Sequence, residues 1–175
     1  MFSEEKVAHI AAYFLIRGKG RLPHIKLIKL MYLADRESMK QYGSPISYDR
    51  MVSMPHGPVL SNTLDLINGY SQGIWGEYIS DRANHEVSLQ KDIKDTQELD
   101  ALSDADEKIL SKIWDQFGSM GKFDLVGYTH KQENCPEWKN PNGSSCSISY
   151  EDVYRAVGYS NEQAKELAEE LNSYL

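Results

Sequence analysis

Apolar residues recur at intervals of three and four positions in several stretches of the chain, which predicts amphipathic helices. The first helix is predicted to begin after Ser3, a good N-cap residue, and to end at Gly18. The second is predicted from Pro23, which suits a first helical turn, to about Gln41, with Gly43 closing it. The N-terminal part of the chain is therefore expected to form two helices.

The middle of the chain is predicted to combine extended segments with a third helix. Residues 47–54 are expected to be extended, and the third helix is expected to span residues 56–69. Residues 75–80 and 86–89 have the composition of short strands, and the polar residues 81–84 between them suit a turn. These segments predict a small antiparallel sheet.

The C-terminal part is predicted to be helical again. Residues 103–118 form a capped helix in this prediction, and residues 123–130 form a short one. A long loop follows over residues 131–148, and two final helices begin at Ser149 and Ser160, the latter in a capping box. The predicted fold is α+β and mainly α, with six to seven helices and an antiparallel sheet of two to three short strands.

The length and net charge of the chain limit the classes of function that it can have. A chain of 175 residues can bury a core without disulfides, so a single domain over residues 1–175 is expected. The net charge is −7, and it divides into +4 over residues 1–60 and −11 over residues 61–175. This balance excludes indiscriminate nucleic-acid binding. Two cysteines, no signal peptide and no apolar run of membrane-spanning length indicate a cytoplasmic protein without a membrane partner.

One acidic residue of the second helix lies where an apolar side chain is expected. At about 100° per residue, Asp35 falls inside the apolar arc, between Ile28 and Met39. The polar arc opposite contains Lys26, Lys29, Arg36, Glu37 and Lys40. A buried carboxylate needs a charge partner or several hydrogen bonds, and the candidates are Arg50, His56 and the free N–H groups at the start of the third helix. Asp35 is expected to pin the second helix to the following turn, and the alternative is an acid in a ligand pocket.

A catalytic pair is a second interpretation of the same residues. In the run His56-Gly57-Pro58, the imidazole would lie beside the first turn of the third helix, where it could cap that turn or join Asp35 as a general base. No nucleophile accompanies this pair, because Ser53 and Ser61 occur in no activation motif. A hydrolase-like enzyme using Asp35 and His56 is therefore kept only as an alternative.

Metal, cofactor and DNA sites are not expected. The spacing of His130, Cys135 and Cys146 matches no standard zinc pattern, and no glycine-rich phosphate loop occurs. The remaining histidines, His9, His24 and His85, form no ligand cluster in sequence. Basic residues concentrate at Arg17, Lys19, Arg21, Lys26 and Lys29. A helix–turn–helix is disfavoured there because the second helix is apolar over half its circumference. Solvated surface is the first interpretation, an acidic protein partner the second and DNA the third.

The order of these motifs resembles the Panacea domain, the SocA-like and GepA-like antitoxin module of bacteria and their phages. The resemblance rests on four segments: Lys29 to Asp35, Tyr42-Gly43 with Pro45-Ile46, Asp49 to Val59, and Leu125 to Trp138. One departure is Glu137, which separates Pro136 from Trp138 where the family often has the two adjacent. The signature residues are expected to be structural: Tyr32, Asp35, Asp49, His56, Gly57, Pro58, Thr129, His130 and Trp138.

The resemblance implies an antitoxin that binds and neutralises a toxin encoded by an adjacent gene. A related family member works as an adaptor that delivers its toxin to a protease, so this role is the first alternative. A DNA-binding autoregulator is a further alternative. Because no long disordered tail is evident, the toxin is expected to bind the folded surface. The candidate interface residues are Tyr70, Trp75, Tyr78, Trp138 and Tyr150.

Overall fold

The structure is a computed structural model that describes residues 1–70 and 73–174. It confirms the α+β, mainly helical class, with eight α-helices and two small antiparallel sheets in the described residues. The helices are α1 (Glu4–Arg17), α2 (His24–Tyr42), α3 (Ser61–Ile67), α4 (Trp75–Tyr78), α5 (Asp104–Phe117), α6 (Lys122–His130), α7 (Tyr150–Ala156) and α8 (Asn161–Ser173), with a 3₁₀ turn η1 (Thr96–Glu98). The strands are β1 (Arg21–Pro23), β2 (Met51–Met54), β3 (Gly57–Leu60), β4 (Glu86–Ser88) and β5 (Cys146–Ser147).

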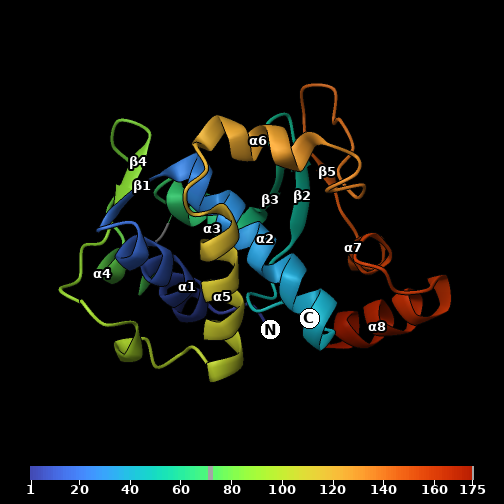
Figure 1. The fold of residues 1–175 in the computed structure, drawn as a ribbon, viewed down its shortest axis with the longest axis horizontal. Coiled ribbons are helices and arrows are strands. Elements are labelled where there is room, and N and C mark those ends of the chain that lie inside the picture. Colours follow the sequence, from blue (N-terminus) through green and yellow to red (C-terminus); the bar gives the residue numbers. More distant parts are fainter. Residues whose placement is uncertain (71–72, 175) are drawn as a thin grey trace.

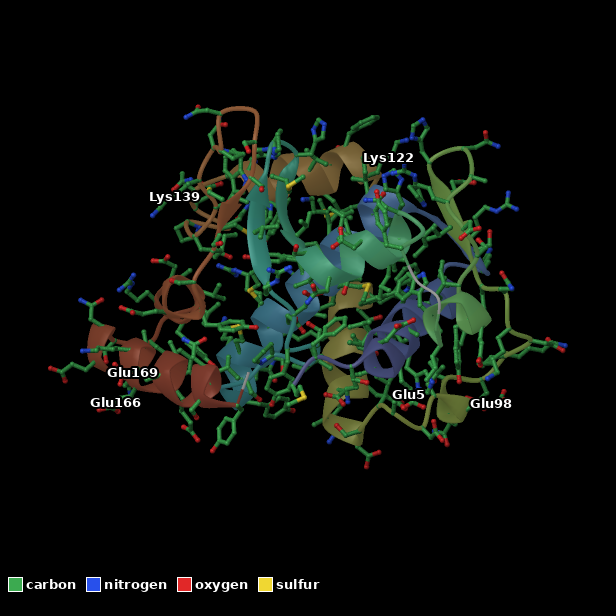
Figure 2. All side chains as sticks on the ribbon, turned by 180° about the vertical axis from the view of Figure 1, so that it is seen from behind. Glu5, Glu98, Lys122, Lys139, Glu166 and Glu169 are labelled. Atoms are coloured by element: carbon green, nitrogen blue, oxygen red, sulfur yellow. The ribbon has the colours of Figure 1, made fainter. Side chains whose placement is uncertain are left out.

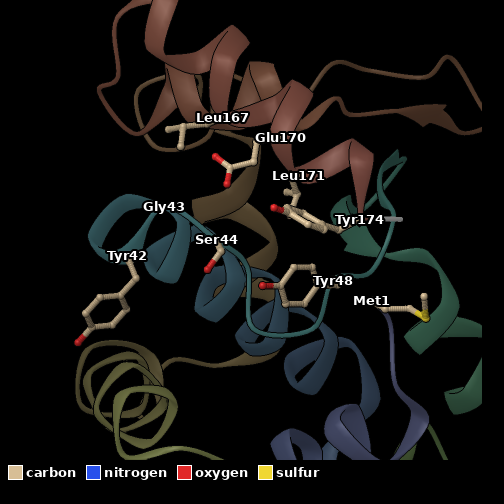
Figure 3. A pocket seen from close by; sticks show the side chains of 9 residues that line it. All are labelled: Met1, Tyr42, Gly43, Ser44, Tyr48, Leu167, Glu170, Leu171 and Tyr174. Carbon is tan, nitrogen blue, oxygen red and sulfur yellow. The ribbon is translucent and has the colours of Figure 1, made fainter.

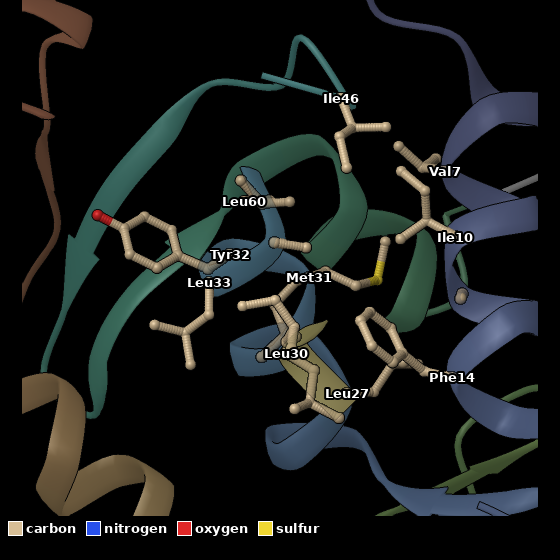
Figure 4. Close-up of a cluster of buried hydrophobic side chains, with 14 of the residues drawn as sticks. Val7, Ile10, Phe14, Leu27, Leu30, Met31, Tyr32, Leu33, Ile46 and Leu60 are labelled. Carbon is tan, nitrogen blue, oxygen red and sulfur yellow. The ribbon is translucent and has the colours of Figure 1, made fainter. Parts of the chain in front are cut away.

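The helix α2 is the centre of the molecule, and it is buried on nearly every side. Figure 1 shows it crossing the middle of the fold, and it contacts α1, α5, α6, α7 and β3. Its apolar side chains meet those of α1 in the main core, where Phe14 packs near Leu27 and Met31 (Figure 4). The expectation that Lys29 lies on a polar, solvated arc is wrong, because only 1% of this residue is exposed.

Local capping signals explain where most helices begin and end. The Ser3 side chain accepts a hydrogen bond from the Lys6 N–H at the start of α1. Capping boxes begin α5 at Ser103 and α8 at Ser160, and α2 ends at Gly43 with a left-handed φ of 76°. The sequence predictions for these four helices are confirmed to within a residue or two.

The hairpin of β2 and β3 corrects the predicted start of the third helix. Residues 57–60 are a strand, paired with β2 in the order β3-β2-β5, and α3 begins only at Ser61. Pro58 suits a first helical turn, yet it lies in an edge strand, where a missing N–H is tolerated.

The second correction concerns residues 75–80. Residues 75–78 form the single turn α4 instead of a strand, and the Trp75 N–H donates to Oε1 of Glu4 at 2.9 Å. The strand β4 pairs instead with β1, and only an isolated bridge from Ile79 to Leu89 remains of the predicted pairing. Long-range partners on α1 and β1 decided both outcomes.

The last two helices form a layer at the side of the molecule. Residues 131–149 lead from α6 through β5 to α7, and α8 returns toward the end of α2 (Figure 1). Met1 and Tyr174 line one cavity, so the two described ends of the chain lie close together. No helix among the described residues is both long enough and apolar enough to span a bilayer.

Candidate functional site around helix α2

Three side chains hold the tip of the β2–β3 hairpin by its carbonyl groups. Trp138 donates its indole N–H to the Met54 carbonyl oxygen at 3.0 Å, and the Lys29 ammonium donates to that of Pro58 at 2.7 Å. The Nε2 atom of His130 lies 2.8 Å from the Pro55 carbonyl oxygen. We call Lys29, His130 and Trp138 the hairpin clamp. These three residues come from α2, from the end of α6 and from the loop after it.

The amine of Lys29 has an unusual environment. Burial lowers its pKa to about 7, because the interior disfavours the charged form. Gly57 lies directly against it: a Cβ atom there would be 2.9 Å from the Lys29 Nζ and 2.7 Å from the Thr129 Oγ1. Gly57 also has a φ of 103°, so glycine is required by both space and backbone conformation.

His130 joins the clamp to α6. Its Nδ1 atom lies 2.6 Å from the Val126 carbonyl oxygen, and its ring meets that of Trp138 edge to face at 4.4 Å. His56 belongs to no such network: it is exposed at the hairpin tip, away from the start of α3 where it was expected.

A buried acid beside the clamp was not expected as part of the site. The carboxylate of Glu137 accepts hydrogen bonds from the Tyr32 hydroxyl at 2.7 Å and from the Arg36 Nε at 2.7 Å. Burial and the neighbouring Glu137 raise the pKa of Tyr32 well above its usual value. The only signal in the sequence was the position of Glu137 between Pro136 and Trp138. Its two partners lie on α2, about a hundred positions earlier, so spacing alone could not reveal them.

Asp35 ties the end of α2 to the segment that follows it. Its Oδ1 atom accepts from the N–H groups of Ile46 and Ser47, each at 2.9 Å, and its Oδ2 atom accepts from the Ser47 hydroxyl. The partners are therefore local, not Arg50, His56 or the start of α3. Burial raises the pKa of Asp35 to about 7, although the three donors favour the ionised form.

Asp49, and not Asp35, accepts hydrogen bonds from the free N–H groups at the start of α3. Its carboxylate accepts from the Asn62 N–H at 2.9 Å and from the N–H and the hydroxyl of Thr63, each at 2.7 Å. The Asp49 N–H donates to the Ser47 hydroxyl oxygen at 3.0 Å, and its carbonyl accepts from the Tyr150 hydroxyl at 2.7 Å. Burial raises the pKa of Asp49. We call Asp35, Ser47 and Asp49 the carboxylate brace.

The arrangement has no catalytic pair of the kind considered from the sequence. Asp35 is fully buried and bonded to Ile46 and Ser47, whereas His56 lies exposed on the hairpin. Ser53 is buried and accepts a hydrogen bond from the Lys139 N–H at 3.2 Å. What the brace and the clamp do chemically is to satisfy buried backbone groups.

Possible metal ligands meet elsewhere in the fold. In the described part of the chain, the only group with suitable geometry is Glu5, His9 and Asp100, so His9 is not isolated as expected. The His9 Nδ1 already accepts from the Ala101 N–H at 3.1 Å, which competes with a metal for that lone pair. Burial raises the pKa of Cys135 to about 12, which keeps it a thiol.

Comparison with known proteins places these features in a family. The family model described as "Antitoxin SocA-like, Panacea domain" matches residues 27–139, more than half of the chain. The chain belongs to this family. No curated protein and no solved structure matches it.

The Panacea domain contains both networks. Its matched residues 27–139 extend from α2 to just after Trp138, so the hairpin clamp and the carboxylate brace lie inside them. The helices α7 and α8 follow the matched region, although Tyr150 of α7 reaches back to Asp49.

The aromatic residues that were candidates for an interface differ in exposure. Tyr70 of the Panacea domain is 77% exposed. The other four side chains, Trp75, Tyr78, Trp138 and Tyr150, are buried in the core. Tyr70 is therefore the only one of the five that presents its ring to a partner without rearrangement of the fold.

Proposed function

We propose that this protein is an antitoxin of a bacterial or phage toxin–antitoxin pair, which acts by binding its cognate toxin directly in the cytoplasm. The observation that carries this proposal is the match of residues 27–139 to the SocA-like Panacea antitoxin family. The toxin is the product of the adjacent gene in this proposal. Residues 1–175 act as one domain in this proposal, with α8 lying beside the end of α2 (Figure 1).

The hydrogen bonds of the buried charged residues support a binding function over a catalytic one. Asp35 and Asp49 each accept three hydrogen bonds from neighbouring groups, and Lys29 donates to a carbonyl oxygen. An acid or base that acts on a substrate must reach it. Groups that are buried and bonded in this way support the framework, and we propose that the exposed surface of that framework binds the toxin.

Co-expression with the neighbouring gene tests the proposal. Rescue of growth together with a co-purified complex is the expected result. A neighbour product that arrests growth despite this protein, and does not co-purify with it, would overturn the proposal. The variant His56→Gln separates binding from catalysis without disturbing the core, because His56 is exposed. It is expected to rescue growth fully, whereas a hydrolase that uses His56 would lose rescue.

The protease-adaptor alternative makes a different prediction for the same strain. An adaptor shortens the half-life of the toxin, while a direct inhibitor leaves the half-life unchanged or longer. A pulse-chase measurement of the toxin with and without this protein decides between them.

A further inference from the structure

Two adjoining cavities form a groove beside the end of α2 and the segment after it; the first cavity borders the C-terminal part of α8, and the second borders the starts of α1 and α5. Their volumes are about 530 Å³ and about 670 Å³, within the range of ligand and side-chain pockets. Both are lined by Met1, Tyr42, Ser44 and Tyr48. Figure 3 shows Tyr48 and Tyr174 beside the same opening, with Glu170 and Leu171 on α8. We call these two cavities the α2–α8 groove.

The rim of the groove carries exposed aromatic rings. Tyr174 is 62% exposed and Tyr42 is 52% exposed, while Tyr48 is partly buried. The hydroxyl groups of these three tyrosines make no hydrogen bond to any described residue. Tyrosine side chains that combine an apolar ring with a free hydroxyl are typical anchors of protein interfaces.

Tyr48 has a backbone conformation that the carboxylate brace imposes. Its φ is 53°, in the left-handed region, which is rare for a bulky side chain and costs roughly 1 kcal/mol or more. Ser47 on one side is bonded to Asp35, and Asp49 on the other side caps α3, so both neighbours are fixed in the interior. The residue between them turns outward, and its ring reaches the groove. Strain of this kind is found where a side chain is positioned for a task.

The charge of the groove indicates the chemistry of its occupant. The ionised side chains that line the two cavities are Glu170, Asp100, Asp106 and Lys6. Lys6 already pairs with Asp106 at 2.5 Å. Asp100 lies 3.9 Å from the His9 Nδ1 but keeps 89% of its side chain exposed, and Glu170 pairs with no described cation. Outside the groove, α8 also carries the exposed residues Glu162, Glu166 and Glu169 (the last two labelled in Figure 2), and Glu169 pairs with Lys165 at 3.8 Å. Residues 61–175 carry a net charge of −11.

We propose that the α2–α8 groove is the docking site for a basic, arginine-bearing segment of the toxin, with Tyr48 and Tyr174 as its aromatic anchors. This inference rests on the proposed antitoxin function. An arginine guanidinium can lie over a tyrosine ring while it bonds a carboxylate such as Glu170 or Asp100. A basic partner is also attracted by the acidic surface before contact, which accelerates association.

Binding measurements on the intact protein test the docking site. The probe is the purified product of the adjacent gene, and the readout is its dissociation constant. Tyr48→Ala and Tyr174→Ala are each expected to weaken binding by about tenfold or more. Tyr70→Ala tests the competing interface at the exposed aromatic residue considered above, and Phe123→Ala is the control, since Phe123 is 73% exposed but lines neither cavity. The control is expected to bind like the wild type.

Charge reversal gives an independent measurement on the same surface. Asp100→Lys and Glu170→Lys are expected to weaken binding and to reduce its salt dependence, while Asp65→Lys on α3 is the control at an exposed position outside the groove. Tyr174 and both acids are exposed, so these variants remain informative even if Tyr48→Ala were to disturb the fold.

The outcomes separate the two proposals. Wild-type binding that the groove variants leave unchanged would overturn the docking site and leave the antitoxin function standing. Loss of binding in Tyr70→Ala alone would place the interface at α3. Groove variants that change the oligomeric state but not toxin binding would make the groove a contact between copies of this chain. If the wild type neither binds nor rescues, the antitoxin function fails and the docking site fails with it.

Discussion

The hairpin clamp forms hydrogen bonds with backbone carbonyl groups, whereas the carboxylate brace forms them with backbone N–H groups. In the clamp, Lys29, His130 and Trp138 meet carbonyl oxygens of the hairpin tip. In the brace, Asp35 and Asp49 accept from N–H groups of two other segments. The clamp closes the space between the hairpin and α6. The brace instead fixes residues 46–49 so that Tyr48 faces outward.

One buried helix, α2, organises both of these regions, although their tasks differ. The clamp and the brace both start from α2, at Lys29 and Asp35, less than two helical turns apart. Lys29 donates a hydrogen bond to a carbonyl oxygen of the hairpin, and Asp35 accepts hydrogen bonds from N–H groups of the segment after α2. The same buried helix therefore supports a closed region and an open groove, and the charge of each side chain decides which backbone groups it can hold.

The largest expected effect is the loss of the brace. Asp35→Ala leaves the N–H groups of Ile46 and Ser47 without their acceptor and is expected to lower the free energy of unfolding by about 3 to 5 kcal/mol. Urea denaturation measures this change. Asp65→Ala, which removes an exposed carboxylate from α3, is the control and is expected to stay within about 0.5 kcal/mol of the wild type. Equal effects of the two variants would show that Asp35 is not needed to hold the segment.

The next effect is a pH dependence of opposite sign in the two regions. The pKa of Asp35 is raised to about 7, so between about pH 4 and 7 the folded state binds the extra proton, and stability falls as the pH rises. The pKa of Lys29 is lowered to about 7, so between about pH 7 and 10 the unfolded state binds the extra proton, and stability rises with pH. Each slope approaches about 1.4 kcal/mol per pH unit.

Variants assign these slopes to the two residues. Lys29→Met is expected to remove the alkaline rise and keep the acidic fall, and Asp35→Asn is expected to do the reverse. The measurement is the free energy of unfolding in urea from about pH 5 to about pH 9. Unchanged slopes in both variants would mean that other groups carry the pH dependence.

A smaller effect is expected from a single hydrogen bond of the clamp. Trp138→Phe removes the indole N–H that donates to the Met54 carbonyl oxygen and is expected to lower the free energy of unfolding by about 1 to 2 kcal/mol. Trp114→Phe is the comparison, because its indole N–H makes no hydrogen bond to any described residue. Chemical denaturation of both variants is sufficient, and a larger loss at Trp114 would contradict the role given to the Trp138 N–H.

The smallest effect on stability is expected at Tyr48, because two consequences of its replacement oppose each other. Tyr48→Gly relieves the left-handed strain but removes a partly buried ring, so the free energy of unfolding is expected to change by less than about 1 kcal/mol. Thermal denaturation tests this near-neutral result. Destabilisation well beyond that range would show that Tyr48 serves the core and not the groove.

Helices with local signals could be predicted from the sequence. Ser3, Ser103 and Ser160 lie within three residues of the backbone groups they cap, and Gly43 ends α2 through its own backbone angle. The burial of Asp35 could also be predicted, because it interrupts an apolar arc. The same periodicity failed for Lys29, since a helical wheel assumes one solvated face and α2 is enclosed on nearly all sides.

The candidate site could be predicted only as a set of residues, not as an arrangement. The sequence brought together Tyr32, Asp35, Asp49, Thr129, His130 and Trp138 by resemblance, but it did not show which carbonyl or N–H group each one meets. It placed His56 at a helix start, where the structure has a hairpin, because Gly57 and Pro58 suit both. It also missed Glu137 and Tyr48, whose roles depend on neighbours distant in the chain or on a backbone angle.

The helical class, both ends of α1, α2 and α5, the start of α8 and the burial of one acid thus follow from sequence alone, because these depend on contacts a few residues apart. Tertiary structure decided the rest. The pairing of β4 with β1, the single turn of α4 and the partners of Glu137 and Trp138 all join segments separated by about 60 to 100 positions. No local pattern records which of the possible long-range contacts forms, since that depends on how the whole core packs around α2.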